Sequence, residues 1–180
     1  MPKKSLMFTL VLAFVLMIST IFTPWNVAAK EKTPIMVTLK NTEGQTAGRA
    51  TLKETKKGVQ VHLHAEGLTP GVHGIHFHEK GVCKPPTFDS AGSHFNPYNK
   101  EHGLKNPKGP HAGDLKNVFA DSNGKINIAF TTDRVTLKKG AENSLLDDDG
   151  SALVIHEGAD DQKTNPSGNS GAKVLCGSIK

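Results

Sequence analysis

The chain has 180 residues, with 22 Lys and Arg against 17 Asp and Glu, which gives a formal net charge of +5 with neutral histidine. This length suits one ordinary domain rather than several. The basic excess is small and spread along the chain, and a single Trp and a single Tyr offer little for base stacking. We therefore expect no nucleic-acid partner. Nine His and two Cys are the more informative features.

The N-terminal segment indicates export. Lys3 and Lys4 precede an apolar stretch over residues 6–22, and Val27-Ala28-Ala29 offers small residues at a cleavage point. This order is typical of a secretory signal peptide. The apolar stretch is also close to the shortest that can span a bilayer, so a retained membrane anchor is the alternative. We expect residues 1–29 to be a signal peptide or an anchor, and residues 30–180 to form one exported domain, secreted or otherwise extracytoplasmic.

Period-2 alternation of apolar and polar residues predicts half-buried strands. The alternation is clear over residues 35–39 and 59–65, returns at 126–130 and is weaker at 153–155, while residues 174–176 form a short apolar run. Gly-containing turns, such as Glu43-Gly44 and Lys57-Gly58, separate these pieces. No ten-residue helical stripe is present in the sequence. The pattern predicts an all-β fold, an antiparallel sandwich or barrel.

Two stretches, residues 81–113 and 157–171, are rich in Gly, Pro, Asn, Asp and His and show no alternation. They are predicted to be long loops. Ordering such loops costs about 1 to 2 kcal/mol of chain entropy per residue, so something functional is expected to hold them. In an oxidising compartment Cys83 and Cys176 would form a disulfide. The loop that it closes approaches 100 residues, and the chain-entropy model then gives about 4 to 5 kcal/mol of stabilisation.

A metal could hold the loops as well. His76 and His78 are two apart, so on a strand both imidazoles project from one face while Ile75 and Phe77 face the other. One such pair is a weak signal, because His62 and His64 have the same spacing on another predicted strand. We interpret that second pair as solvent-facing side chains.

The first pair belongs to a larger set of candidate ligands. Imidazoles with one carboxylate and no thiolate suit Zn(II) or Cu(II). The seven candidates are one short of the eight that two separate four-ligand sites would need. An imidazole deprotonated at both nitrogens could bind both metals and so supply the missing ligand. His94 lies between the strand pair and the loop cluster in sequence. The candidates are His76, His78, His94, His102, His111, Asp114 and His156.

At this point the chain resembles the Cu/Zn superoxide dismutase family over essentially the whole length after residue 29. The matching motifs are GVHGIHFHE at residues 71–79, SAGSHFNP at 90–97, HAGDL at 111–115, LVIHE at 153–157 and VLCG at 174–177. Their number and order make chance similarity negligible. The resemblance implies a Greek-key antiparallel β-sandwich or barrel of about eight strands with two long functional loops.

The resemblance also implies two metal sites that share one ligand. The implied copper ligands are His76, His78, His94 and His156. The implied zinc ligands are His94, His102, His111 and Asp114. Asp160 resembles a carboxylate that accepts hydrogen bonds from one ligand of each metal, which fits the general need to orient ligating imidazoles. His73 resembles a histidine that braces the loops without binding metal.

One position departs from the family pattern. The family usually has Arg three residues before the second Cys, and here Lys173 takes its place. Lys173 keeps a cation near the copper opening, but it lacks the planar fork that fixes an anion's position. We expect a working but slower enzyme.

The implied reaction is disproportionation of superoxide to oxygen and hydrogen peroxide, with copper cycling between Cu(II) and Cu(I). Zinc does no redox chemistry and is expected to be structural. His94 is implied to release copper on reduction and to take up a proton. Members of this family occur as monomers and dimers, so a homodimer stays open. The rival function is a non-enzymatic extracytoplasmic copper- and zinc-binding protein on the same fold, since a fold does not determine a function.

Overall fold

The computed structural model describes residues 33–180, and the predicted signal peptide or anchor lies outside these residues. Nothing in residues 33–180 is a helix long and apolar enough to cross a membrane. The described part of the chain contains nine strands and one short 3-10 turn at Asp89–Ala91. The strands are β1 (Ile35–Asn41), β2 (Thr46–Thr55), β3 (Gly58–Ala65), β4 (Gly71–His73), β5 (Ile75–His78), β6 (Val118–Ala120), β7 (Ile126–Thr132), β8 (Ser151–His156) and β9 (Lys173–Ile179).

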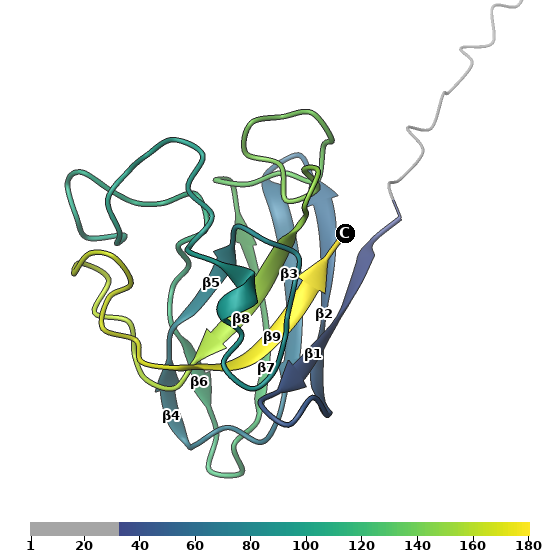
Figure 1. Ribbon diagram of the computed structural model, residues 1–180, viewed down its shortest axis with the longest axis vertical. Coiled ribbons are helices and arrows are strands. Elements are labelled where there is room, and N and C mark those ends of the chain that lie inside the picture. Colours follow the sequence, from purple (N-terminus) through teal and green to yellow (C-terminus); the bar gives the residue numbers. More distant parts are fainter. Residues whose placement is uncertain (1–32) are drawn as a thin grey trace, which may run out of the picture. The chain divides into compact units, whose positions relative to one another are not determined.

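Seven of the strands form one antiparallel sheet in the order β5-β8-β9-β1-β2-β3-β7, and β4 pairs with β6 separately (Figure 1). The large sheet curls into a half-barrel. β1, β2 and β3 follow one another as hairpins, whereas β7 joins β3 and β9 returns to β1 through longer connections. This arrangement confirms the predicted all-β Greek-key fold.

β3 shows why the alternation predicted strands correctly. Val61 and Leu63 are buried in the core, while His62 and His64, which alternate with them, are exposed. The partners of Leu63 are Ala50 on β2 and Ile128 on β7, so the register aligns the apolar faces of three strands. A slip of one residue would turn each buried side chain outward, and burial therefore sets this register.

β2 was not predicted from the sequence. Its inward residues include Ala50 and Leu52, both fully buried, but Arg49, Thr51 and Lys53 alternate with them and the apolar side chains are small or few. The pairing of β2 with β1 is also irregular next to Leu39. β2 is recognisable only once β1 and β3 flank it.

β8 is buried on both faces because two apolar clusters use it. Leu153 and Ile155 belong to the main core, whereas Ala152 and Val154 face a smaller cluster. The residues that complete the smaller cluster come from the loop after β5 and from β9, and are Phe88, Ala91, Cys176 and, partly buried, Cys83. A strand covered on both sides reads as a continuous apolar run, which explains its weak alternation.

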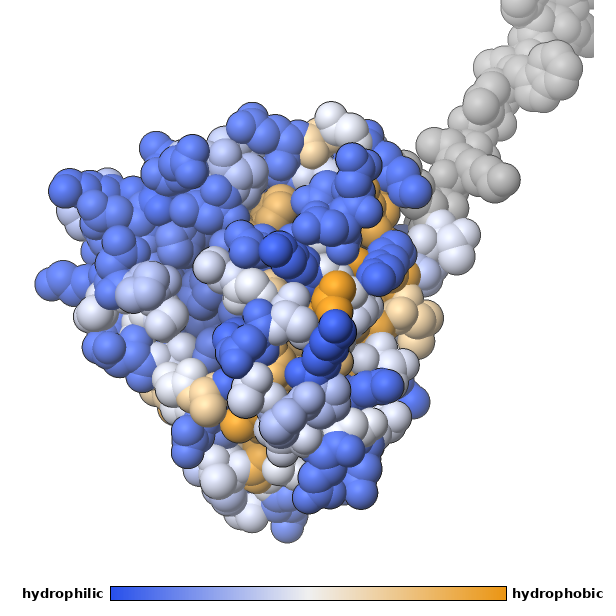
Figure 2. Space-filling model, in the orientation of Figure 1, coloured by the Kyte–Doolittle hydropathy of each residue, from blue (hydrophilic) through white to orange (hydrophobic). Residues whose placement is uncertain are grey.

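The predicted disulfide between Cys83 and Cys176 is present, with Cα atoms 5.7 Å apart and a sequence separation of 93 residues. It fastens the loop after β5 to β9. The stretches 81–113 and 157–171 contain no strand, as predicted. On the face shown in Figure 2, hydrophilic residues cover the upper left, where the loops of Figure 1 lie, and hydrophobic residues show only in small areas.

Candidate metal centre

The site is built on β5, whose residues alternate between the core and the loops. Ile75 and Phe77 are fully buried in the main core. His76 and His78 point the other way and are nevertheless buried, with 0% and 2% of their surface exposed, because the long loops cover that face. The predicted strand geometry of this pair is confirmed, and so is the solvent exposure of His62 and His64.

Four buried imidazoles converge beneath the loops. One ring nitrogen of each of His76, His78, His94 and His156 lies within 4.8 Å of those of the other three. Within residues 33–180, each of these four rings has one buried nitrogen without a hydrogen-bond partner: Nδ1 of His76 and Nε2 of His78, His94 and His156. Buried polar atoms are nearly always hydrogen-bonded, so four orphans in one place need another partner. A cation such as copper fits a set of neutral imidazole nitrogens.

In three of these rings the second nitrogen has a partner that sets the orientation of the ring. His76 Nε2 donates to Asp160 Oδ2 at 2.7 Å, and His78 Nδ1 donates to the Gly92 carbonyl at 2.9 Å. His156 Nδ1 donates to the Gly171 carbonyl at 3.1 Å. With the proton on that side, the other nitrogen keeps its lone pair and can bind a metal.

A second cluster forms around one carboxylate oxygen, Oδ1 of Asp114. Nδ1 of His94 and Nδ1 of His102 both lie 3.0 Å from it, and Nδ1 of His111 lies 3.3 Å away. Ligands at about 2.0 Å from a tetrahedral zinc ion are about 3.3 Å from one another, so these spacings fit zinc. The four-residue group within 4.8 Å comprises His76, His94, His102 and Asp114, and His111 is not a member of it.

Asp160 joins the two clusters. Its Oδ2 accepts from His76, and its Oδ1 lies 3.0 Å from His102 Nε2. The carboxylate therefore contacts one histidine of each cluster. His73 on β4 is also buried: its Nδ1 lies 2.7 Å from the His156 carbonyl oxygen and its Nε2 lies 2.8 Å from that of Thr69.

Sequence reasoning missed two residues that position Asp160. The Asn117 side chain donates to the Asp160 carbonyl at 2.8 Å and accepts from the Asp160 amide at 3.1 Å. Gly168 has a φ of +65°, and a Cβ there would collide with the Asp160 carboxylate and lie 2.7 Å from His102 Nε2. Asn117 acts on Asp160 across 43 residues and Gly168 acts through its backbone conformation, and a single sequence carries no signal for either role.

Burial controls the protonation of the first cluster. It lowers the pKa of His76 to about 3 and that of His156 to about 4, and it holds the pKa of His78 well below its usual range. Neighbouring histidines lower these pKa values further. Metal ions bind the neutral imidazole, so these three rings are ready to bind at neutral pH.

His102 behaves in the opposite way. Burial alone would lower its pKa, but hydrogen bonds to the Asp114 and Asp160 carboxylates outweigh burial and raise the pKa to about 9. The same contacts hold the pKa of Asp114 and that of Asp160 below their usual range, against the effect of burial. Without a metal, His102 therefore keeps a proton between two carboxylates, and metal binding would displace that proton.

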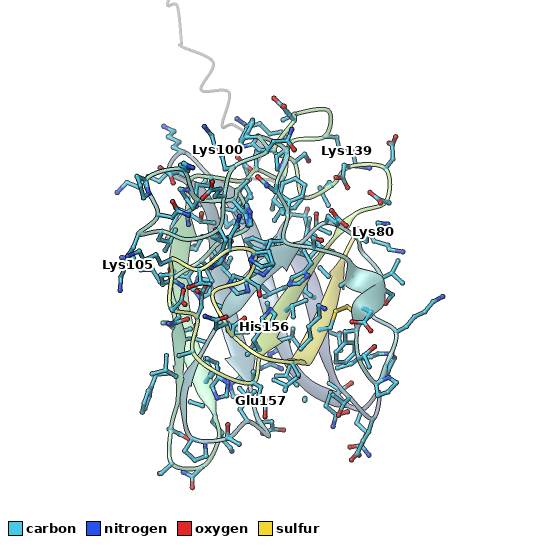
Figure 3. All side chains as sticks on the ribbon, turned by 60° about the vertical axis from the view of Figure 1, so that its left-hand side comes forward. Lys80, Lys100, Lys105, Lys139, His156 and Glu157 are labelled. Atoms are coloured by element: carbon cyan, nitrogen blue, oxygen red, sulfur yellow. A yellow bond between two sulfur atoms is a disulfide. The ribbon has the colours of Figure 1, made fainter. Side chains whose placement is uncertain are left out.

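A cation lies beside the first cluster, on β9. Lys173 is the register partner of His156, and its charge contributes to lowering the pKa of that histidine. Lys173 Nζ lies 3.5 Å from Asp89 Oδ1 in the loop that carries Cys83, and the carboxylate is largely exposed. Figure 3 shows His156 in the interior, enclosed by strands and loops, while Lys80, Lys100 and Lys105 lie at the periphery.

Known proteins are similar to this chain in sequence and fold. Residues 46–179 match the family model described as copper/zinc superoxide dismutase. Superoxide dismutase [Cu-Zn] 2 of Aquifex aeolicus is 52% identical over 141 residues, which cover 78% of this chain and 82% of that protein. The superoxide dismutase-like protein YojM of Bacillus subtilis is 49% identical, over 79% of this chain and 74% of that protein.

Solved structures agree with these matches. A crystal structure of a SOD-like protein from Bacillus subtilis superposes with a TM-score of 0.80 at 47% identity, over 82% of this chain and all of that chain. Cu/Zn superoxide dismutase from Brucella abortus has a TM-score of 0.68 at 30% identity, over 82% of this chain and all of that one. The chain belongs to the copper/zinc superoxide dismutase family. Copper and zinc are the cofactors of that family, and both histidine clusters fit them.

Proposed function

We propose that the protein is a superoxide dismutase, which converts two superoxide anions and two protons into oxygen and hydrogen peroxide. The observation that carries the proposal is the group of four buried, unpartnered imidazole nitrogens. They belong to His76, His78, His94 and His156, which we assign to copper. When bound, copper supplies the electron transfer, accepting an electron from one superoxide and returning it to the next.

We assign zinc to His94, His102, His111 and Asp114. His76 lies close enough to compete with His111, but its Nε2 already donates to Asp160 and its Nδ1 is one of the four orphans of the copper cluster. His111 Nδ1 is buried without a hydrogen-bond partner and lies 3.3 Å from Asp114 Oδ1. Asp114 Oδ2 meanwhile accepts from the backbone amides of Gly103 and His111, which holds the carboxylate in place.

His94 is the residue that links the two sites. Its Nδ1 lies 3.0 Å from Asp114 Oδ1 in the zinc cluster, and its Nε2 belongs to the copper cluster. We assign it two roles, as shared ligand and as carrier of a proton at Nε2 during turnover. A buried ring held on its Nδ1 side can exchange a proton at Nε2 without moving far.

Lys173 is assigned to attract the anionic substrate. It lies next to His156, so its positive charge is near the copper position. A superoxide ion needs only an open coordination position and an attractive field. Asp89, whose Oδ1 lies 3.5 Å from Lys173 Nζ, competes with superoxide for the ammonium group. The flexible lysine stem also fixes an anion less well than a guanidinium would. Both features favour a slower enzyme than one with arginine.

The disulfide indicates an oxidising compartment, where such bonds persist. We propose that residues 1–29 direct export, either as a cleaved signal peptide or as a retained anchor. Mass spectrometry of the N-terminus of the native protein distinguishes these two outcomes.

A metal-binding protein without turnover is the second candidate function. It is favoured by YojM, a relative that is 49% identical and is named only superoxide dismutase-like. The test is reconstitution of the metal-free chain with zinc and then copper, followed by metal analysis and a superoxide-consumption assay. The proposal expects one copper and one zinc per chain together with catalysed consumption. Full occupancy of both metal sites without turnover would establish the non-enzymatic metal-binding protein instead.

A further inference from the structure

A second pair of histidines lies on β3, which four strands of the sheet separate from β5 and the metal centre. His62 and His64 project from the outer face of β3, while the alternate residues Val61 and Leu63 enter the core. Within residues 33–180, neither imidazole has a hydrogen-bond or ion-pair partner. Both rings can therefore rotate and present a nitrogen to a ligand.

The spacing of the pair suits chelation. Residues two apart on a strand are about 6.7 Å apart at Cα and point the same way. Two exposed imidazoles at this separation can tilt toward one ion, because copper–nitrogen and zinc–nitrogen bonds are both about 2 Å long. The two histidines line a surface depression of about 300 Å³, together with side chains of β2 and β7 such as Thr51 and Ala129.

A third donor approaches from β1. Thr51 is the direct register partner both of Met36 on β1 and of His62 on β3, so the three residues form one row across the sheet. β1, β2 and β3 lie side by side in Figure 1. The Thr51 hydroxyl donates to the Met36 thioether at 3.2 Å. This contact draws the exposed sulfur over β2, toward His62.

The charge of the surroundings selects the ion. Arg49 lines the depression and is the register partner of His64, and no carboxylate lines it. Three neutral donors beside a cation favour a singly charged metal over a doubly charged one. A thioether with two imidazoles is a ligand set for copper(I), whereas zinc(II) is usually bound with thiolate or carboxylate donors as well.

We propose that His62, His64 and Met36 form a second, exposed copper(I) site on the outer face of the sheet. This site is separate from the buried centre and does not depend on the dismutase assignment. Its exposure implies rapid exchange of the ion with solvent.

The test uses the full chain with zinc and copper already at the buried centre, kept reduced and free of oxygen. Copper(I) is added in competition with a chromophoric copper(I) chelator. The native chain should bind one further equivalent. The double variant His62→Ala/His64→Ala should lose it, and Met36→Leu should weaken it by about tenfold. Gln60→Ala, on the same face of β3 without a metal donor, is the matched control and should bind within twofold of the native chain.

Three results would overturn the proposal. They are no further equivalent in the native chain, an unchanged equivalent in the double histidine variant, and unchanged affinity in Met36→Leu. Displacement of the added copper by an equal concentration of Zn(II) would also contradict the assignment to copper(I). His62, His64 and Met36 are exposed and Gln60 is partly buried, and equal thermal unfolding midpoints will confirm that the variants are folded.

Discussion

Two strands of this protein carry the same His-x-His spacing and use it differently. On β3, His62 and His64 face solvent, and the surrounding side chains on that face belong to other strands of the sheet. On β5, His76 and His78 face two long loops, which bury them and bring His94 and His156 alongside. The strand determines which face a pair occupies, and the loops determine whether that face becomes a buried, multi-ligand centre.

Removing one imidazole on the covered side should have the largest effect. His78→Ala takes one of four nitrogens from the copper cluster, and we expect kcat/KM for superoxide consumption to fall by about ten-thousandfold, to background. Gln60→Ala, on the exposed face of β3, should stay within twofold. Assays at matched zinc content, together with copper analysis, check the comparison. Substantial activity in copper-loaded His78→Ala would show that the two loops do not assemble the four-imidazole site that we describe.

Releasing the loop that covers β5 tests whether the loops are what bury the copper cluster. Cys83→Ser/Cys176→Ser opens a 93-residue connection, and the free energy of unfolding should fall by about 4 to 5 kcal/mol. Denaturant unfolding of the metal-free chain measures this change. The native chain treated with a thiol reductant is the control and should show a similar loss. No change in either sample would mean that the smaller apolar cluster holds the loop by itself.

Burial of the covered imidazoles also predicts a pH dependence. The folded-state pKa of His156 is about 4 and that of His76 about 3, both below the unfolded value of 6.5. The unfolded chain therefore binds protons first as the pH falls, and stability is lost from about pH 6.5 downward. His156 alone accounts for about 3 kcal/mol by pH 4. His102, with a raised pKa of about 9, loses its contribution as the pH rises from 6.5 to 9.

Denaturant unfolding of the metal-free protein at pH 4.5, 5.5 and 7.5 measures the acid limb. The variant His156→Gln cannot take up this proton and should show a shallower loss than the native chain. An equally steep loss in both would show that the acid limb has another origin.

Asp160 orients one ligand from each cluster, so its loss should affect both metals. Asp160→Asn removes the charge but retains most of the shape, and we expect the affinity for each metal to fall by about 10- to 100-fold. Metal competition with chelators gives both constants. Asp161→Asn is a matched control, because the neighbouring carboxylate contacts Thr164 and Asn169 rather than a candidate ligand. Equal effects of the two substitutions would contradict a special role for Asp160.

The smallest effect is expected at Lys173, beside the copper cluster. Lys173→Arg should raise kcat/KM about threefold at low ionic strength, because the guanidinium fork holds an anion better than the lysine ammonium. The advantage should shrink as salt is added, since salt screens exposed charges. An unchanged or lower kcat/KM at low ionic strength would mean that the lysine is already suited to its position.

Some of this structure could be predicted from the chain alone. The alternation around Val61 and Leu63 predicted β3 correctly, because one face is buried and the other is wet. β2 could not be predicted in this way, since Arg49, Thr51 and Lys53 dilute its signal and its small apolar residues gain meaning only beside β1 and β3.

The candidate site, too, could be predicted only in part from the sequence. His76 and His78 follow from strand geometry, and the count of histidines indicated a shared ligand. The roles of individual ligands came from a resemblance of motifs rather than from spacing. Asn117 and Gly168 stayed hidden because they act on Asp160 through contacts across 43 residues and through backbone conformation.

The loop that carries Cys83 also supplies the Gly92 carbonyl, which accepts from His78. Thiol oxidation and ring alignment are thereby linked through one short segment. A newly synthesised polypeptide with both thiols intact would leave that segment loosely anchored and the His78 ring poorly aimed. The cross-link therefore favours copper capture, because it holds in place the segment that aims one of the copper ligands.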